Sequence, residues 1–303
     1  MTTFSIVIAA LVLDALLGEP RRYHPLVGFG RLAQLVEHRL YGDSVWRGSI
    51  ATLLVLSPPL LLVSWGSSTS GAGILLETFL LYLTVGWNSL QQHARHVQEA
   101  LEAGNLHEAR RYAGLMVSRD TAHLDEEGVA RATVESVLEN GNDALFGTLF
   151  WFALAGAPGA VGYRLVNTLD AMWGYRDTRY SRFGRTAARL DDLLNLIPAR
   201  LTAFGYLLAG EAKRALRCWK KQAPAWKSLN AGVVMAAGAG SLGVRLGGDA
   251  WYGGILRPRP PLGEGRRPAS GDIERALRLV RDSMFVWLTA LLIGGLLVET
   301  LIR

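Results

Sequence analysis

A chain of 303 residues, half of them hydrophobic and 19% charged, carries less charge than a typical soluble domain, in which about a quarter of the residues are charged. Cys218 is the single cysteine, which excludes an internal disulfide and a cysteine-based zinc site. The net charge of +6 does not indicate nucleic-acid binding, because no aromatic-basic stacking motif accompanies it and positive loops are typical of inner-membrane proteins.

Uncharged runs predict several membrane-spanning helices. Residues 48–76 and 78–92 contain no charged side chain and are separated only by Glu77, which leaves room for two helices that cross a bilayer. The N-terminal run lacks a basic segment and a convincing cleavage site, so we interpret it as a retained helix rather than a signal peptide. We therefore expect an all-α, polytopic integral membrane protein with spans at residues 3–18, 48–66, 74–92 and 283–301.

Basic residues predict the orientation of these spans. The turn expected at residues 66–73 holds no lysine or arginine, whereas arginines precede and follow this hairpin. The positive-inside rule therefore places the turn outside and its flanks in the cytoplasm of a bacterial cell, with the protein in the inner membrane. Within a single membrane-embedded domain over 1–303, we expect a cytoplasmic helical region at 93–143 and a polar site region at 164–282.

Residues 144–163 bring two rules into conflict. Their uncharged composition is typical of a spanning helix, but the segment that follows is rich in arginines, among them Arg164 and Arg176, which belong on the cytoplasmic side. A turn at Gly156-Ala157-Pro158-Gly159 resolves the conflict. We therefore expect a re-entrant helical hairpin over 144–163 that returns Asp143 and Asp170 to the same side of the membrane.

The middle of the chain is soluble in character. From residue 91 to residue 140, apolar residues recur at helical spacing among charged ones. This pattern predicts three amphipathic helices, with breaks at Gly104-Asn105 and around Arg119-Asp120-Thr121. The proline-rich segment 257–271 is interpreted as an exposed loop that leads to the last helix.

Acidic and amide side chains gather in three constellations. On the helix expected over residues 125–140, Arg131, Glu135 and Glu139 follow one another at i,i+4 spacing. Such a stripe is usually a solvated face, but this one runs into an uncharged segment, where a carboxylate is costly unless it is used. The constellations comprise Glu139, Asn140 and Asp143; Asn167 and Asp170; and Arg189, Asp191, Asp192, Asn195 and Arg200.

These constellations favour a site for a metal ion and phosphates. Oxygen-rich groups of Asp, Glu and Asn suit Mg²⁺, which normally binds one or two carboxylates together with phosphate oxygens. Each motif alone has low specificity, and their joint occurrence in one stretch of the chain carries the hypothesis. The sequence contains no Gly-Lys dipeptide, so ATP cannot be bound by a P-loop.

Three other patterns have simpler interpretations. Residues 238–243 match a dinucleotide fingerprint, but Gly247-Gly248 follows too soon for the helix that this fold requires, and the small residues favour close helix packing instead. Residues 28–33 match a looser fingerprint and are interpreted as a cytoplasmic loop. His93 and His96 lack a third ligand and are interpreted as surface or core histidines.

Several blocks, in this order, resemble the CobD/CbiB family over about residues 9–285. Ser118, Thr148, Ala171 and Leu229 depart from residues common in the family, and none of these departures removes a charged or amide group. The blocks are DALLGEPRRYHPLVGFG at 14–30, Arg119-Asp120-Thr121, Glu139-Asn140 with Asp143, NTLDAMWGY at 167–175, ARLDDLLNLIPARLTA at 188–203, SLNAG at 228–232 and LGG at 246–248.

The resemblance implies an adenosylcobinamide-phosphate synthase of cobalamin biosynthesis. Such an enzyme is expected to join a propionate carboxylate of adenosylcobyric acid to the amine of (R)-1-aminopropan-2-ol O-phosphate, or a close analogue, with ATP as cosubstrate and Mg²⁺. The expected catalytic carboxylates are Glu139, Asp143, Asp170, Asp191 and Asp192, of which the four aspartates are the expected metal ligands. Arg119, Arg189 and Arg200 are expected to bind phosphates, and Asn140, Asn167 and Asn195 to orient the substrates.

Further expectations concern the site and its partners. We predict that the five catalytic carboxylates converge in one pocket near the cytoplasmic membrane boundary, because gathered carboxylates need cations or basic partners. The lipid bilayer and the corrinoid are expected partners, and self-association or association with other late cobalamin-pathway membrane proteins is left open. A non-catalytic membrane sensor and a small-molecule transporter are the alternatives, and the inverted repeats that a transporter should show are not found.

Overall fold

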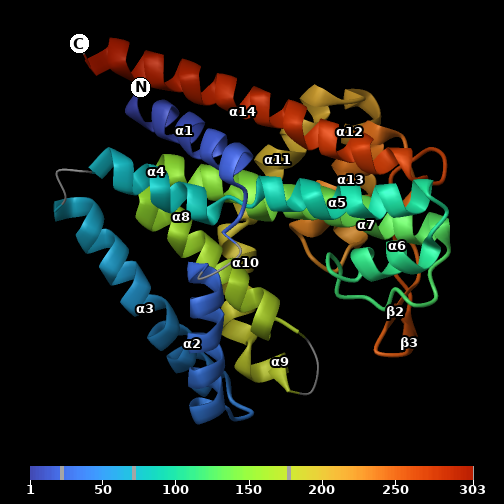
Figure 1. The fold of residues 1–303 in the computed structure, drawn as a ribbon, viewed down its shortest axis with the longest axis horizontal. Coiled ribbons are helices and arrows are strands. Elements are labelled where there is room, and N and C mark those ends of the chain that lie inside the picture. The colour runs from blue at the N-terminus through green and yellow to red at the C-terminus, as the bar shows by residue number, and fades with distance from the viewer. Residues whose placement is uncertain (21–23, 70–72, 176–178, 303) are drawn as a thin grey trace. The chain divides into compact units, whose positions relative to one another are not determined.

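The computed structural model describes residues 1–20, 24–69, 73–175 and 179–302 (Figure 1). The described chain forms two compact units, each built from two separate stretches. The first unit comprises Met1–Gly86 and Asp143–Asn195, and the second comprises Trp87–Asn142 and the chain from Leu196 onward. Arg21 and Arg22 of the first family block, Ser70-Gly71 of the predicted turn, and Arg176 lie outside the described residues.

The first unit is helical throughout its described part. Its core gathers apolar side chains of α2, α3, α8, α9 and α10 around Trp173, Phe183 and Leu169, none of which is exposed. The helices are α1 Thr2–Leu17, α2 Pro25–Leu40, α3 Val45–Thr69, α4 Gly73–Thr84, α8 Gly147–Trp173, α9 Tyr180–Phe183 and α10 Arg185–Leu194, and a π-helical turn over Asn142–Phe146 precedes α8.

Four helical stretches of the described chain are long and apolar enough to cross a membrane. They cover Val45–Ser68, Gly73–Glu102, Glu126–Trp173 and Gly271–Leu301, which include three of the four predicted spans. The fourth, at residues 3–18, corresponds to α1, a shorter apolar helix. The span predicted at 74–92 is interrupted, because α4 ends at Thr84 and the next helix begins at Trp87.

The chain reverses within α8, as the turn predicted at residues 156–159 requires. Gly156 has φ 62° and ψ −155°, a conformation essentially confined to glycine. Beyond it the second arm returns along the first: a Cβ atom on Gly147 would lie only 2.2 Å from the Tyr163 hydroxyl. Residues 16 apart on a straight helix would be about 24 Å apart. The hairpin geometry is therefore present, and its re-entrant insertion into a bilayer stays a prediction.

The second unit combines helices with two small antiparallel sheets. Strand β1 (Leu246–Gly247) pairs with β4 (Pro261–Leu262), and β2 (Ala250–Tyr252) pairs with β3 (Ile255–Arg257). The exposed loop predicted at 257–271 is confirmed only in part, since much of the segment is irregular and exposed but β4 lies within it and Leu262 is fully buried. The all-α prediction is incomplete because of these strands. The helices are α5 Trp87–Glu102, α6 Leu106–Ala113, α7 Glu126–Gly141, α11 Leu196–Ala209, α12 Ala212–Gln222, α13 Ala231–Leu242 and α14 Gly271–Ile302, with a 3₁₀ turn at Ala223–Ala225.

Three local predictions have different outcomes. Helices α5, α6 and α7 occupy the predicted places, but α7 is buried on almost every side and is not amphipathic. The small residues of α13 do serve close packing, since a Cβ atom on Gly240 would lie 2.7 Å from Cα of Ala215. The loop expected at 28–33 is wrong, because those residues continue α2, which begins at Pro25 behind a His24 cap.

Candidate functional site

Asp191 lies at the centre of a polar cluster in the first unit. From α10 its carboxylate accepts hydrogen bonds from the side-chain amides of Asn167 (3.2 Å) and Asn195 (3.1 Å). Asn195 is buried, and its own oxygen accepts a hydrogen bond from the Tyr163 hydroxyl at 2.8 Å. This chain of contacts fixes the amides so that their N–H groups face the carboxylate. Asn167 and Asn195 therefore orient Asp191, and their predicted role in orienting the substrates stays a prediction.

Other carboxylates surround Asp191. Its burial, and then the negative charges of Asp143 and Asp192, raise the pKa of the Asp191 carboxyl to about 7, against the opposing effect of the two amides. Asp170 on α8 lies within the electrostatic reach of both Asp191 and Asp192. The structure thus brings together four of the five predicted carboxylates, from segments 142–146, α8 and α10.

A basic hollow adjoins this cluster. It measures about 270 Å³ and lies within the first unit, at the start of α10. Asp192 and Arg189 line it, as does Arg185, which the sequence interpretation had not singled out. Guanidinium groups match the geometry of phosphate oxygens, so the hollow offers cations for an anionic group beside the carboxylates. Arg164 adds a further cation, since it donates to the side-chain oxygen of Asn167 at 3.4 Å.

The donor set suits Mg²⁺ only in the company of a phosphate. Among the residues that the structure describes, no three His, Cys, Asp or Glu side chains are arranged as a ready-made metal cage. Mg²⁺ rarely uses such a cage and instead takes one or two carboxylates, with phosphate and water oxygens completing its octahedron. The aspartates together with the neighbouring arginines fit that chemistry, which still leaves each aspartate's role as a ligand a prediction.

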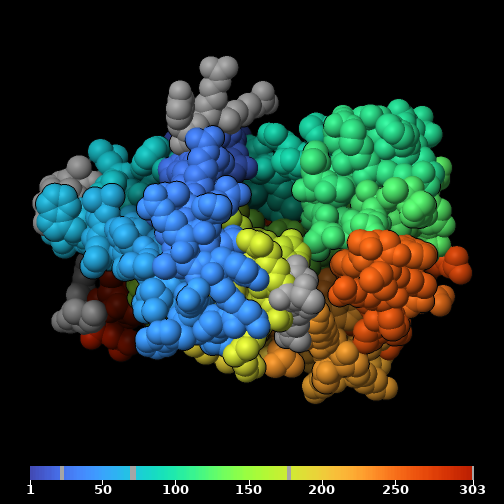
Figure 2. All heavy atoms as spheres, turned by 90° about the horizontal axis from the view of Figure 1, so that it is seen from below, coloured from blue at the N-terminus to red at the C-terminus, as the bar shows by residue number. Residues whose placement is uncertain are grey.

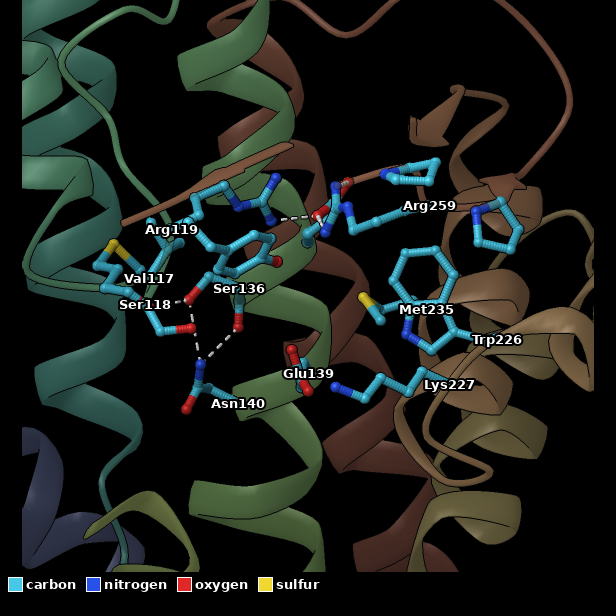
Figure 3. Close-up of a pocket in the computed structure, with 15 residues that line it drawn as sticks. Val117, Ser118, Arg119, Ser136, Glu139, Asn140, Trp226, Lys227, Met235 and Arg259 are labelled. Carbon is cyan, nitrogen blue, oxygen red and sulfur yellow. Dashed lines mark hydrogen bonds and ion pairs between the residues drawn. The ribbon is translucent and has the colours of Figure 1, made fainter. Parts of the chain in front are cut away.

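The second unit contains a separate cavity of about 300 Å³ (Figure 3). Three predicted residues line it: Arg119, Glu139 and Asn140. The Asn140 amide donates to the carbonyl (2.9 Å) and hydroxyl (3.1 Å) oxygens of Ser136, so it is held against its own helix. Glu139 is half-buried on the same side of α7. Its predicted convergence with the four aspartates of the first unit stays a prediction.

A buried carboxylate that the sequence interpretation placed on the acidic helix face, but not in the site, lines one wall of this cavity. Glu135, only 1% exposed, accepts hydrogen bonds from Arg119, from Arg259 (3.1 and 3.3 Å) and from the backbone N–H of Gly247 (2.7 Å). A buried carboxylate is tolerated when it is paired and hydrogen-bonded, as here. Through these hydrogen bonds Glu135 joins α7 to the segment before it and to the chain that follows α13.

The Arg-Asp-Thr block binds the hairpin formed by β2 and β3. The backbone N–H of Asp120 donates to the carbonyl of Trp251 at 2.8 Å, and its carboxylate accepts from the N–H of Gly254 at 2.8 Å. Figure 2 shows this hairpin (orange) lying against the green segment that carries Asp120. Arg119 and Asp120 are neighbours in the chain, so one short segment binds both Glu135 of α7 and the β2–β3 hairpin.

Arg200 occupies a different position from the other predicted phosphate ligands. It donates to the Asn230 side-chain oxygen at 2.6 Å and to the Leu196 carbonyl at 2.8 Å, and it holds the 228–232 loop to α11. It is not among the residues that line the cavity. Its predicted contact with phosphate stays a prediction, while its structural contacts explain why arginine stands there.

The sequence of this chain is similar to those of a known protein family. The model of the family described as "CobD/Cbib protein" matches residues 7–280. The chain belongs to the CobD/CbiB family. Among the family's curated members, one from Stutzerimonas stutzeri is 58% identical, covering 97% of this chain and 99% of its own, and one from Chromobacterium violaceum is 55% identical, covering 95% and 96%. One from Mycobacterium tuberculosis is 39% identical, covering 91% and 90%.

These CobD/CbiB relatives share one printed name, cobalamin biosynthesis protein CobD. No solved structure matches the chain. Sequence reasoning did not include Arg259 and Arg185, and it named Glu135 on the acidic helix face without assigning it to a site. Glu135 carried a signal, since it lies one turn before Glu139 on α7, whereas Arg259 contacts a carboxylate 124 residues away and had none.

Proposed function

We propose that the protein is an adenosylcobinamide-phosphate synthase that joins adenosylcobyric acid to (R)-1-aminopropan-2-ol O-phosphate, or a close analogue, in an ATP-dependent step of cobalamin biosynthesis. The observation that carries the proposal is Asp191, held between Asn167 and Asn195 among three other carboxylates. Its support comes from family membership and from the name of the relatives, cobalamin biosynthesis protein.

Amide formation from a carboxylate requires activation. A carboxylate is a poor electrophile, so in the proposal one of its oxygens attacks the γ-phosphorus of ATP, and the bond between that phosphorus and ADP breaks. The amine nitrogen then attacks the acyl carbon, the amide bond forms, and inorganic phosphate leaves. The transferred group carries dense negative charge, which Arg185 and Arg189 beside Asp192 are suited to stabilise.

Proton transfer accompanies the second step. The attacking amine must lose one proton from its ammonium form, and a general base works best when its pKa lies near the working pH. Asp191, whose pKa is raised to about 7, suits this demand better than an ordinary aspartate while no cation is bound to it, because a bound cation favours its ionised form. Glu139 is the proposed partner of the ammonium group in the second unit.

Mg²⁺ bound with the nucleotide would neutralise phosphate charge, and the proposed residues that hold it are Asp143, Asp170, Asp191 and Asp192. The proposed location is the bacterial inner membrane, with these groups facing the cytoplasm, where ATP is available. The apolar helices of the chain support membrane residence. The second candidate, a non-catalytic membrane sensor, would not need the acidic blocks at 167–170 and 189–195, which this chain retains.

The test is reconstitution with purified components. Detergent-purified protein would be incubated with adenosylcobyric acid, aminopropanol phosphate, ATP and Mg²⁺, and the corrinoid products analysed by mass spectrometry. The proposal expects a product heavier by the amine phosphate less one water, formed only when ATP is present. Protein that folds normally yet yields no ligated corrinoid, beside an active relative, would overturn it.

A further inference from the structure

Arg164 lies beside the acidic cluster of the first unit, yet its hydrogen bonds within the described chain go to uncharged acceptors. Its Nη1 group donates to the backbone carbonyl of Asp143 and to the side-chain oxygen of Asn167, both at 3.4 Å. These contacts are long for an N–H donor, which prefers about 2.9 Å. The Nε–H of Arg164 is buried and has no hydrogen-bond partner among the described residues. The protein itself therefore engages this guanidinium only weakly.

We propose that Arg164 binds the terminal phosphoryl group of the nucleotide at the acidic site. The identity of the nucleotide rests on the proposed function, whereas the class of ligand, an oxyanion, follows from the contacts of Arg164 alone.

Other carboxylates of the protein are paired directly with arginines. Glu37 accepts two hydrogen bonds from Arg179 (2.9 and 3.2 Å), and Asp272 accepts two from Arg266 (2.6 and 2.7 Å). Direct pairing is the usual way in which a buried carboxylate is neutralised. An arginine that served only to neutralise the acidic cluster would pair in the same way, and within the described chain Arg164 does not.

Asn167 lies between the guanidinium of Arg164 and the carboxylate of Asp191. Its side-chain oxygen accepts from Arg164, and its side-chain N–H donates to Asp191 at 3.2 Å. A direct ion pair would have to break before either charged group could bind a ligand. Hydrogen bonds to a neutral amide are weaker than those between two charged groups, so they are more easily exchanged. Arg164 thus stays available to an anion, and Asp191 to a cation.

A phosphate group that arrives with Mg²⁺ satisfies both demands. Guanidinium N–H groups match the geometry of phosphate oxygens, and Mg²⁺ joins phosphate oxygens to one or two carboxylates. The four neighbouring aspartates would repel an anion that arrived alone. The cation is therefore part of the ligand.

The burial of Arg164 selects one end of the phosphate chain. Arg185 and Arg189 are exposed where they line the hollow at the start of α10, whereas Arg164 is only partly exposed and its Nε is buried. The adenosine end of a nucleotide is bulky, and the terminal phosphoryl group is compact. A nucleotide that enters from the hollow therefore reaches Arg164 with its terminal phosphoryl group.

Calorimetric titration of the full-length protein in detergent tests this role without a corrinoid. The probes are the Mg²⁺ complexes of AMP-PNP, which keeps a terminal phosphoryl group but resists its transfer, and of ADP, which lacks that group. We expect Arg164→Gln to weaken the binding of AMP-PNP at least tenfold and to change the binding of ADP less than twofold. Arg164→Lys, which retains the charge without the planar fork, should have an intermediate effect on AMP-PNP.

The matched control is Arg39→Gln, the same change at an exposed arginine of α2, which should leave both affinities unchanged. Melting temperatures identify variants that misfold, and if Arg164→Gln is one of them, Arg164→Lys should still weaken AMP-PNP more than ADP. Equal effects on the two nucleotides, or no effect on either, would overturn the role of Arg164 and leave the proposed function standing. A wild-type protein that binds no AMP-PNP would overturn both.

Discussion

Replacing Asp191 by asparagine probes the acidic cluster through stability as well as activity. In the folded protein, burial and the charges of Asp143 and Asp192 raise the pKa of Asp191 to about 7, whereas an aspartate in an unfolded chain titrates near 3.9. Between these values the folded chain keeps a proton that the unfolded chain has lost. The stability from this group is therefore fully present below the unfolded pKa and is lost as the pH rises through about 7.

The magnitude follows from the same shift. Between pH 6 and pH 8, a single carboxyl with a pKa of about 7 changes the free energy of unfolding by at most about 1.4 kcal/mol. Asp191 remains partly exposed, so solvent screening reduces this to roughly 1 kcal/mol, or about 2 °C in the melting temperature. Asparagine does not titrate, so Asp191→Asn should remove this contribution and make the difference between the two pH values smaller than in the wild type.

The assay is thermal unfolding in detergent at pH 6 and pH 8, with and without Mg²⁺ and ATP together. Saturating Mg²⁺ and ATP should also flatten the pH dependence of the wild type, because a bound cation favours the ionised carboxylate in the folded state. Asp43→Asn, at an exposed aspartate, is the matched control and should behave as the wild type does. The reasoning is refuted if Asp191→Asn retains the wild-type difference, or if Asp43→Asn loses it.

Further predictions address the other parts of the account. Asp192→Asn should lower ligation at least a hundredfold with normal expression, by loss of a charge needed for cation binding, and near-normal turnover would contradict the metal assignment. Glu135→Gln should destabilise the fold by about 3–5 kcal/mol in denaturant unfolding, because it leaves two arginines unpaired, whereas Glu127→Gln at a more exposed position should have little effect. Gly156→Ala should cost roughly 1–3 kcal/mol because of its φ of 62°, with Gly30→Ala, in open helix, as the control. Cysteine at exposed Arg182, in a Cys218→Ser background, should react with an impermeant thiol reagent only from the cytoplasmic side, and labelling of intact cells would contradict the topology.

The helical plan was predictable because it depends on local signals. Composition placed the long apolar helices, Gly104-Asn105 marked a true helix break, and Gly156 marked the reversal of α8. Local sequence patterns did not predict the structure of segments whose conformation depends on tertiary contacts. The 257–271 segment has the prolines of an exposed loop, yet β4 pairs with β1 and Arg259 binds Glu135.

Which residues form the acidic site was easier to predict than how their side chains are arranged. Asp143, Asp170, Asp191 and Asp192 were selected because acidic and amide residues gather in that stretch of the chain, and the four aspartates do lie within electrostatic reach of one another. The same reasoning assigned Asn167 and Asn195 to orient the substrates, which stays a prediction, and it did not anticipate that both amides donate to Asp191. Periodicity predicts which residues share a helix face, but it cannot tell whether a polar side chain faces a ligand or another side chain of the protein.

The central claim is most directly tested by following a label through the reaction. Adenosylcobyric acid with ¹⁸O in its free carboxylate would be incubated with the purified protein, aminopropanol phosphate, ATP and Mg²⁺. The account predicts adenosylcobinamide phosphate together with inorganic phosphate that carries one ¹⁸O atom from the carboxylate. Absence of the ligated corrinoid, or ¹⁸O in AMP instead of phosphate, would contradict it.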